Sequence, residues 1–288
     1  MKQLIAIVLL CIFSFCNATS QEFVPDRKVL YKVVNGDSLY LHTFEPKLSK
    51  KPTAAIVFFF GGGWTGGNPS QFYQQSAYFA SRGITAFAAE YRIASVHNTT
   101  PFECVEDGKS AIRWVREHAA ELNIDPDKII AAGGSAGGHI ALCTALIEGY
   151  ENATEDHSIS SIPNILIAYN PVLDTTIKGY GSKKVAGRET AISPCHKIKK
   201  NAPPFLLFHG TEDKTVPFEN AVRFTKLMKE ADNDCMLIAV EGQGHGFFNG
   251  VFFSKKGNDM YLNFTLYESD LFLKKHGYIS GKPTIPSK

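Results

Sequence analysis

The residues that decide the fold are Gly133-Gly134-Ser135-Ala136-Gly137, which join a predicted strand at 128–132 to a predicted helix at 136–148. A strand that turns this sharply into a helix has room only for small residues on both sides of the serine. The turn lifts the Ser135 hydroxyl above the sheet edge and points the amino terminus of the helix at a reacting oxygen. We therefore predict that Ser135 is a nucleophile. The alternative is a glycine-rich turn with an incidental serine.

Strands and helices alternate on both sides of this junction. Residues 28–44 predict a hairpin around Asn35-Gly36-Asp37, a turn that suits positive φ angles. Repeated β-α units after a hairpin predict an α/β fold: a mostly parallel sheet with helices on both faces and ligands at the carboxyl ends of the strands. The other predicted strands are 54–60, 84–90, 164–169, 205–209 and 235–240, and the other predicted helices are 70–81, 101–122, 219–231 and 258–275.

The composition is that of a globular protein. The chain has 288 residues, 44% of them hydrophobic, and its 30 basic and 28 acidic residues give a net charge of +2. This balance argues against a disordered chain and gives no basis for a nucleic acid partner or an anionic membrane surface. The continuous β-α alternation favours one domain over residues 21–288, with an irregular insertion at about 174–204.

Residues 1–20 have the pattern of a cleaved signal peptide. Lys2 precedes an apolar run at 4–15, and Cys16-Asn17-Ala18 offers small residues to a signal peptidase. The run is shorter than the roughly 18 to 20 residues of a membrane anchor. Acylation of Cys16 as in a lipoprotein is disfavoured by Phe15 before it. We predict a secreted or periplasmic protein without a membrane span in the mature chain.

Four cysteines remain after removal of residues 1–20. An oxidising compartment would permit three pairings among them. The alternative is that Cys104 and Cys143, both on predicted helices, are buried thiols. The four are Cys104, Cys143, Cys195 and Cys235.

A serine nucleophile needs a general base, and His245 is the best candidate. It lies within Gly242-Gln243-Gly244-His245-Gly246, directly after the last predicted strand. A glycine-flanked loop there can place an imidazole over Ser135. His209 ends a strand and is expected to be a packed core group, and the other histidines are expected on surfaces or helices.

The acid that orients this base is predicted to be Asp213. It follows the strand 205–209 and comes after Ser135 and before His245 in the chain. Glu212 beside it is the first alternative, because sequence does not say which of the two side chains faces His245. Asp174, after another strand, is the second. The order serine, acid, histidine is that of one of the known serine-triad folds.

The negative charge that develops during acyl transfer needs backbone N–H donors. The helix start supplies the Ala136 amide, and the glycine run after the strand 54–60 supplies Gly62 and Gly63. Trp64, Gln71 and Phe72 are candidates for the wall of the substrate pocket. Alternatively, they pack this loop onto the fold.

Together these motifs resemble the α/β-hydrolase superfamily, and within it the esterase/lipase branch with a His-Gly-Gly-Gly oxyanion loop. The resemblance covers about 28–277 and is closest to secreted bacterial acetyl and acetylxylan esterases. It implies an α/β-hydrolase fold, a Ser135–Asp213–His245 triad and an acyl-enzyme mechanism without metal or cofactor. The motifs are Phe60-Gly61-Gly62-Gly63-Trp64, Glu90-Tyr91-Arg92, residues 133–137, residues 210–217 and Gly244-His245-Gly246.

One departure concerns Phe60, which stands where the family usually has the loop histidine. That histidine helps to hold the loop, so the resemblance leaves loop rigidity and acyl specificity open. The only obvious insertion is short, which predicts an open site. We expect a serine carboxylesterase that cleaves short-acyl, chiefly acetyl, esters on carbohydrate. A lipase-like or feruloyl esterase is the alternative.

Rival functions use parts of the same sequence. The pattern Gly61-Gly62-Gly63-Trp64-Thr65-Gly66 after a strand, with Glu90 ending the next, also fits a nicotinamide-dependent oxidoreductase. Trp64 would crowd the pyrophosphate there, and the serine, acid and histidine would have no role. A non-catalytic carbohydrate-binding protein would be expected to lack a triad member. The sequence has no metal-ligand spacing.

Overall fold

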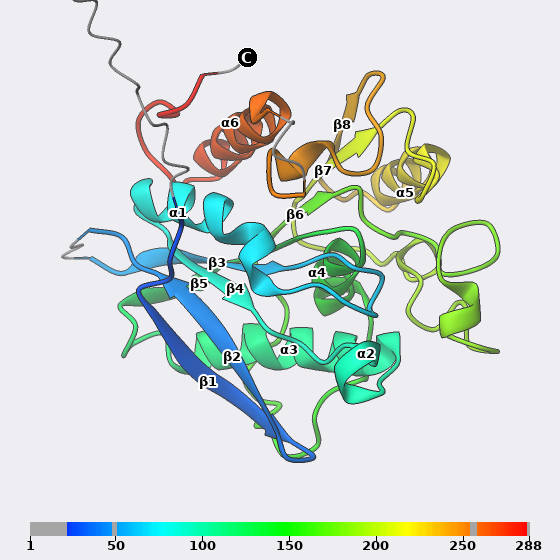
Figure 1. Ribbon diagram of the computed structural model, residues 1–288, viewed down its shortest axis with the longest axis horizontal. Coiled ribbons are helices and arrows are strands. Elements are labelled where there is room, and N and C mark those ends of the chain that lie inside the picture. The colour runs from blue at the N-terminus through cyan, green and yellow to red at the C-terminus, as the bar shows by residue number, and fades with distance from the viewer. Residues whose placement is uncertain (1–21, 48–50, 254–257, 287–288) are drawn as a thin grey trace, which may run out of the picture.

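The computed structural model describes residues 22–47, 51–253 and 258–286. The predicted signal peptide lies outside these ranges. The eight strands form one sheet in the order β1-β2-β4-β3-β5-β6-β7-β8, antiparallel at β1/β2 and β2/β4 and parallel elsewhere (Figure 1). This confirms the predicted fold class. The strands are β1 (Arg27–Val34), β2 (Asp37–Phe44), β3 (Thr53–Phe59), β4 (Thr85–Ala89), β5 (Ile124–Gly134), β6 (Ile165–Tyr169), β7 (Phe205–Gly210) and β8 (Cys235–Val240).

Helices cover both faces of the sheet (Figure 1). Helices α1 and α6 lie on one face, joined by hydrogen bonds from Tyr78 and Arg82 to Asp270, and α3, α4 and α5 lie on the other. No helix in the described ranges combines the length and the apolar character that crossing a bilayer requires. The helices are α1 (Tyr73–Ser81), α2 (Ala94–His97), α3 (Pro101–Glu117), α4 (Ala136–Leu146), α5 (Phe218–Glu230) and α6 (Met260–Lys275), and the 3-10 turns are η1 (Pro69–Phe72), η2 (Ser182–Lys184), η3 (Pro194–His196) and η4 (Phe247–Asn249).

Two predicted helices differ from the structure by more than two residues at one end. The predicted helix 101–122 ends at Glu117, and the chain passes through a left-handed residue, Asn123 (φ 52°), into β5 at Ile124. The predicted helix 70–81 begins as the 3-10 turn η1, because the Asn68 side chain accepts the Ser70 N–H, and becomes α-helical at Tyr73.

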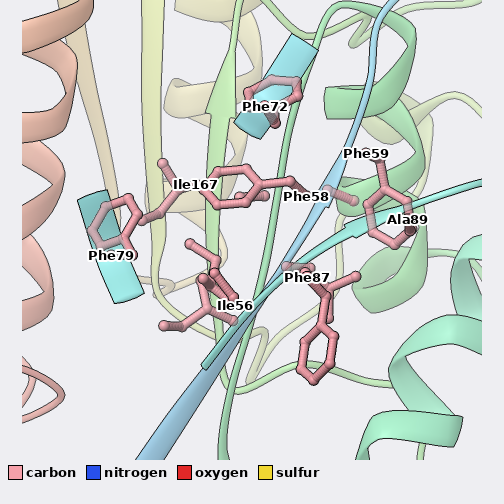
Figure 2. Close-up of a cluster of buried hydrophobic side chains, with 14 of the residues drawn as sticks. Ile56, Phe58, Phe59, Phe72, Phe79, Phe87, Ala89 and Ile167 are labelled. Atoms are coloured by element: carbon pink, nitrogen blue, oxygen red, sulfur yellow. The ribbon is translucent and has the colours of Figure 1, made fainter. Parts of the chain in front are cut away.

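Aromatic side chains of β3 form the centre of the core (Figure 2). Phe58 and Phe59 are fully buried. Because neighbouring residues of a strand point to opposite faces of the sheet, the two rings pack against the helical layers on opposite faces. Phe58 stacks on Phe72 with ring centroids 5.1 Å apart, whereas Phe59 packs toward Gly108 of α3. Burial of each ring contributes about 1.5 to 3 kcal/mol. The β3 strand is thereby fixed from both faces, and the glycine loop that follows it has a rigid base.

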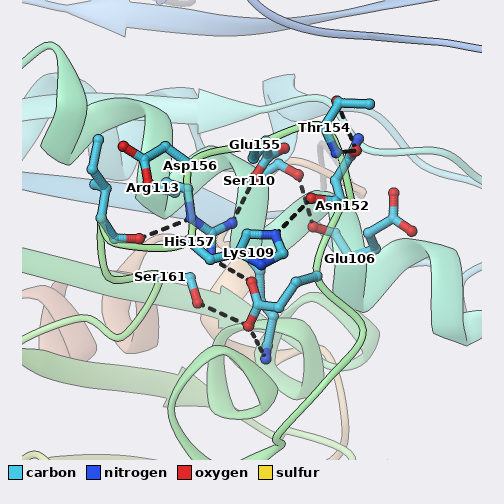
Figure 3. A network of polar contacts seen from close by, with 12 residues as sticks. Glu106, Lys109, Ser110, Arg113, Asn152, Thr154, Glu155, Asp156, His157 and Ser161 are labelled. Carbon is cyan, nitrogen blue, oxygen red and sulfur yellow. Dashed lines mark hydrogen bonds and ion pairs between the residues drawn. The ribbon is translucent and has the colours of Figure 1, made fainter.

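A buried polar network ties the segment between α4 and β6 to α3 (Figure 3). The side chains of Lys109 and Arg113 are only 3% and 4% exposed. Both pair with Glu151, Lys109 at 2.7 Å, and Arg113 also pairs with Glu155. Lys109 donates in addition to the Ile147 carbonyl (2.6 Å). Because removing one partner leaves a buried charge without compensation, such pairs hold a segment firmly in place.

Cys104, Cys143, Cys195 and Cys235 are all free and buried. Burial raises the pKa of Cys195 and of Cys235 to about 12. The buried-thiol interpretation therefore holds for Cys104 and Cys143, Cys195 and Cys235 are buried thiols as well, and none of the three possible pairings forms among these four.

Candidate active site

Ser135 occupies a sharp turn between β5 and α4. Its backbone has φ 54° and ψ −120°, and its N–H donates to the Tyr169 carbonyl at 2.9 Å. A Cβ atom at position 137 would lie 2.0 Å from the Phe59 carbonyl oxygen, so only glycine fits there. The small residues around Ser135 therefore let α4 start directly against β3. The serine is held at the carboxyl end of the central strands in a conformation that side chains rarely adopt.

His245 lies within hydrogen-bonding distance of both Ser135 and Asp213. Its Nδ1 is 2.7 Å from Asp213 Oδ2, and its Nε2 is 2.8 Å from Ser135 Oγ. A carboxylate can only accept, so Nδ1 carries the proton and donates to Asp213. Nε2 is then free to accept the proton of the Ser135 hydroxyl, which is the arrangement that general-base activation requires.

Asp213 is built to remain ionised. Its side chain is fully buried, and its Oδ1 accepts the N–H groups of Thr215 (2.8 Å) and Val216 (2.9 Å). Burial alone would raise the pKa of Asp213, but hydrogen bonds from His209, His245 and Val216 hold that pKa well below its usual range. A charged carboxylate at this position stabilises an imidazolium on His245.

The two alternative acids lie elsewhere. Glu212 is exposed, and no hydrogen bond joins its side chain to His245 within the described part of the chain. Asp174 is buried, but it pairs with Arg223 at 2.9 Å. His209 is the packed core group that the sequence predicts; its Nε2 contacts the Val216 carbonyl (3.0 Å) and Asp213 Oδ2 (3.3 Å).

The glycine loop after β3 presents free N–H groups beside Ser135. The Gly62 carbonyl accepts the N–H groups of Thr65 (3.0 Å) and Gly66 (3.1 Å), which closes a tight turn. Gly62 has φ 129°, and a Cβ atom there would lie 2.0 Å from the Gly66 carbonyl oxygen. In the described ranges no hydrogen bond uses the amides of Gly62 or Gly63, and the Ser135 side chain does not cap the Ala136 helix start. These three predicted donors are therefore available to an oxyanion.

A cavity of about 380 Å³ opens at this point. Gln71 lies on its wall, as the sequence suggests. Trp64 and Phe72 do not line it: Trp64 is 1% exposed and packs against His139, and Phe72 is fully buried between Phe58 and Phe248. For these two the packing interpretation holds. The lining residues are Gly61, Gly62, Gly63, Gln71, Ser135, Tyr180, Thr215, His245, Gly246, Phe248, Asn249 and Phe253.

Phe60, in place of a loop histidine, supports the loop through its backbone and its ring. The ring stacks on Tyr91 with centroids 4.1 Å apart, and the Tyr91 hydroxyl donates to the Phe60 carbonyl at 2.7 Å. On the other side of the loop, Lys184 of the insertion donates to the Gly63 carbonyl (2.8 Å). The insertion therefore contacts the oxyanion loop directly, which the sequence did not indicate.

Asn170 is a further site residue that sequence reasoning missed. It follows β6 and is fully buried, and its Nδ2 donates to the His245 carbonyl while its Oδ1 accepts the Gly210 N–H at 2.9 Å. It thus ties the loop of the base to the strand that leads to the acid. The available signal was its position, a polar residue at the carboxyl end of a parallel strand.

The dinucleotide interpretation is not compatible with these contacts. The Glu90 carboxylate, which would bind a ribose, accepts the Tyr40 N–H (3.1 Å) and pairs with His42 (2.9 Å). The glycine loop leads into the short turn η1 rather than into a long helix. Within the described residues, no group of three or more histidine, cysteine or acidic side chains could hold a metal.

Comparison with solved structures shows close likeness to esterases. Esterase 2 of Thermogutta terrifontis, phosphonylated by cyclosarin, matches at 45% identity with a TM-score of 0.85, covering 91% of this chain and 98% of that chain. A structure of the same esterase 2 with propionate bound matches at 44% identity with a TM-score of 0.83, covering 89% and 96% of the two chains.

Two curated relatives match more weakly. The probable carboxylic ester hydrolase LipM of Mycobacterium tuberculosis is 29% identical over 67% of this chain and 49% of its own length. The acetylxylan esterase of Xylanibacter ruminicola is 28% identical over 69% of this chain and 42% of its own. The chain thus spans about half the length of these relatives.

A family model described as BD-FAE matches residues 41–228, most of the sheet and its helices. This range includes the glycine loop, Ser135 and Asp213. The chain therefore belongs to the BD-FAE family and has the α/β-hydrolase fold.

Proposed function

We propose that this chain is a serine carboxylesterase that hydrolyses short-acyl esters, acetate esters of carbohydrates foremost, outside the cytoplasm. One observation carries the proposal. Ser135, His245 and Asp213 form an unbroken line of hydrogen bonds of 2.8 and 2.7 Å, at a cavity that Gly61, Gly62 and Gly63 also line. The nucleophile, the base and two of the candidate oxyanion donors therefore line one small space, and the buried acid contacts the base.

The geometry suits a two-step acyl transfer. His245 Nε2 takes the Ser135 proton as Oγ attacks the ester carbonyl, and the N–H groups of Gly62, Gly63 and Ala136 bind the oxyanion. The same imidazole then protonates the leaving alcohol, and Asp213 stabilises the imidazolium meanwhile. Water activated by His245 hydrolyses the acyl-serine by the reverse proton route.

The size of the cavity and the relatives support a short acyl group on a carbohydrate. At about 380 Å³ the cavity is near the lower end of the roughly 300 to 1,000 Å³ usual for ligand pockets. One relative binds propionate, and another is named an acetylxylan esterase. Tyr180 and Phe253 also line the cavity, and such aromatic side chains suit contact with a sugar ring.

A substrate panel tests the activity. We expect residues 21–288 to cleave p-nitrophenyl acetate faster than the butyrate and decanoate esters, and to release acetate from acetylated xylan faster than ferulate from feruloyl xylan. A fluorophosphonate probe should label Ser135, located by peptide mass spectrometry, and should not label Ser135→Ala. Preference for decanoate, or labelling at another residue, would contradict the proposal.

The compartment requires a separate test, which rests on residues 1–20. The full chain should be exported by a bacterial host, and amino-terminal sequencing should find a start at Thr19 or Gln21. Retention of Lys2 in the exported protein would contradict cleavage.

A further inference from the structure

The oxyanion loop and the loop of His245 are joined inside the protein by two carboxamide side chains. Gln71 Oε1 accepts the Gly61 N–H at 2.6 Å, and Gln71 Nε2 donates to Asn249 Oδ1 at 2.7 Å. Asn249 Nδ2 in turn donates to the Gly246 carbonyl at 3.0 Å. Gln71 and Asn249 are only 7% and 6% exposed. We call this chain of hydrogen bonds, from Gly61 through Gln71 and Asn249 to Gly246, the amide relay.

The direction of the amide relay is fixed from both ends. A backbone N–H can only donate and a backbone carbonyl can only accept, so Gly61 and Gly246 each permit one orientation of the neighbouring carboxamide. Reversing either side chain would place donor against donor or acceptor against acceptor. Because both side chains are almost fully buried, the hydrogen bonds of the relay polarise one another, and an unpaired group in it would be costly.

The relay acts on the peptide group from which the oxyanion loop starts. That peptide joins Phe60 to Gly61: the Tyr91 hydroxyl holds its carbonyl at 2.7 Å, and Gln71 holds its N–H at 2.6 Å. The orientation of this plane sets where the next two amides, of Gly62 and Gly63, point. A Cβ atom at Gly61 would lie 3.3 Å from Ser135 Cβ, so the gripped peptide runs beside the nucleophile.

The other end of the relay acts on the base. Gly246 follows His245 directly, and its carbonyl also accepts the Asn249 N–H at 3.1 Å. Any shift of the oxyanion loop away from His245 would therefore break a buried hydrogen bond. The relay fixes the distance between the group that binds the oxyanion and the group that moves the proton.

We propose that Gln71 and Asn249 are positioning residues for the esterase reaction, and that Gln71 holds the oxyanion loop in this chain, which has Phe60 at the position of the loop histidine. This assignment rests on the proposed function, because it concerns the same site. Gln71 acts through the amides of Gly62 and Gly63, which must be placed to within a few tenths of an ångström of the oxyanion.

Gln71→Met tests the proposal, because methionine has a similar length and makes no such hydrogen bonds. Loss of one oxyanion donor costs about 10²- to 10³-fold in kcat, so a misplaced loop should cost about 10- to 100-fold, with KM for p-nitrophenyl acetate changed less than about 3-fold. Gln75→Met is the matched control: Gln75 is a buried glutamine that donates to the Phe248 carbonyl at 3.5 Å, and in the described ranges no hydrogen bond joins it to the oxyanion loop. Its kcat should stay within about 3-fold of wild type. An unchanged kcat in Gln71→Met overturns the proposal.

A double-mutant cycle distinguishes positioning from packing. If the relay works as a unit, Gln71→Met combined with Asn249→Leu should lie within about 3-fold of the more damaged single variant. Effects on kcat that multiply would mean two independent packing sites and would overturn the proposal. If Gln71→Met does not fold, Gln71→Glu replaces it, because its carboxylate keeps the Gly61 bond but has no proton for Asn249; it should lose at least about 10-fold in kcat.

Hydrogen exchange tests the amide relay independently of catalysis. The peptide that spans residues 60–66 should exchange faster in Gln71→Met than in wild type, and at the wild-type rate in Gln75→Met. If wild type does not cleave the ester at all, the proposed function fails, while this measurement still decides whether Gln71 holds the loop. Equal exchange in all three proteins would overturn the relay.

Discussion

Ser135 lies on a turn that the core encloses, whereas His245 lies on a loop that solvent reaches. A Cβ atom at Gly137 would meet backbone at 2.0 Å, but one at Gly244 would meet nothing within 4 Å. The His245 side chain is 25% exposed, and its ring donates a hydrogen bond to Asp213. The backbone of the same loop is held by Asn170, which donates to the His245 carbonyl, and by Asn249, which donates to the Gly246 carbonyl. The fold itself places the nucleophile, and individual side chains place the base. Substitutions of the residues that pack around Ser135 should therefore impair folding, whereas substitutions of the side chains that hold His245 should impair turnover.

The largest effect is expected from Ser135→Ala. This substitution removes the proposed nucleophile but changes neither the turn that holds residue 135 nor the side chains that hold His245. We expect kcat for p-nitrophenyl acetate to fall by roughly 10⁴- to 10⁶-fold. The melting temperature should change little, because the turn geometry depends on its neighbours. Near-normal turnover would exclude Ser135 as the nucleophile.

The next effect isolates the support of the base. Asp213→Asn keeps the size of the side chain but removes the charge and disfavours the required His245 tautomer, so we expect a loss of about 10⁴-fold in kcat. Glu212→Gln, one residue away and exposed, should stay within about 3-fold of wild type. Steady-state kinetics on the two variants checks this, and a worse result for Glu212→Gln would reassign the acid.

A pair of glycine substitutions directly tests the contrast between the enclosed turn of Ser135 and the exposed loop of His245. Gly137→Ala places a methyl group against the Phe59 carbonyl and should destabilise the fold by more than about 3 kcal/mol. Gly244→Ala has open space and should cost less than about 1 kcal/mol. Urea unfolding of both variants measures the difference. Equal stabilities would mean that the turn between β5 and α4 can relax, and that the fold does not place Ser135.

The smallest effect is a pH dependence of stability, and it comes from His139 on α4, the helix that follows Ser135. Burial lowers the pKa of His139 to about 4, so the unfolded chain binds a proton between about pH 6.5 and 4 that the folded chain does not. Stability should therefore fall as the pH is lowered through this window, by about 3 kcal/mol at most. Asp213, whose pKa is also lowered, adds a further loss below about pH 4.

Urea unfolding at pH 7 and pH 4.5 measures this pH effect. The loss of unfolding free energy between pH 7 and pH 4.5 should be smaller in His139→Gln than in wild type. It should be unchanged in His157→Gln, because His157 is exposed. A loss in His139→Gln equal to that of wild type would assign the acid sensitivity to other groups.

The arrangement of Ser135, Asp213 and His245 was predictable because each residue lies in a recognisable local motif and at the same edge of the sheet. Ser135, Asp213 and His245 each follow a parallel strand, and the carboxyl ends of such strands meet at one sheet edge. The topology therefore brings together residues 110 positions apart in sequence.

The amide relay has no such signature. Gln71 and Asn249 lie 178 residues apart on short 3-10 turns. No sequence pattern at either position indicates that the two side chains meet. Trp64 and Phe72 failed as wall residues for a related reason. Large aromatic side chains beside a glycine loop gain more free energy in the core than at a pocket rim, and only packing reveals which place is open to them.

The four buried thiols have a consequence for how the protein can be made and moved. In the described residues no covalent cross-link holds the fold, and each of the four cysteines is shielded from oxidants. Folding of this part of the chain therefore needs neither an oxidant nor a disulfide isomerase, and a reductant removes nothing from it. The thiols of this domain therefore allow it to mature in a reducing space as well as in an oxidising one.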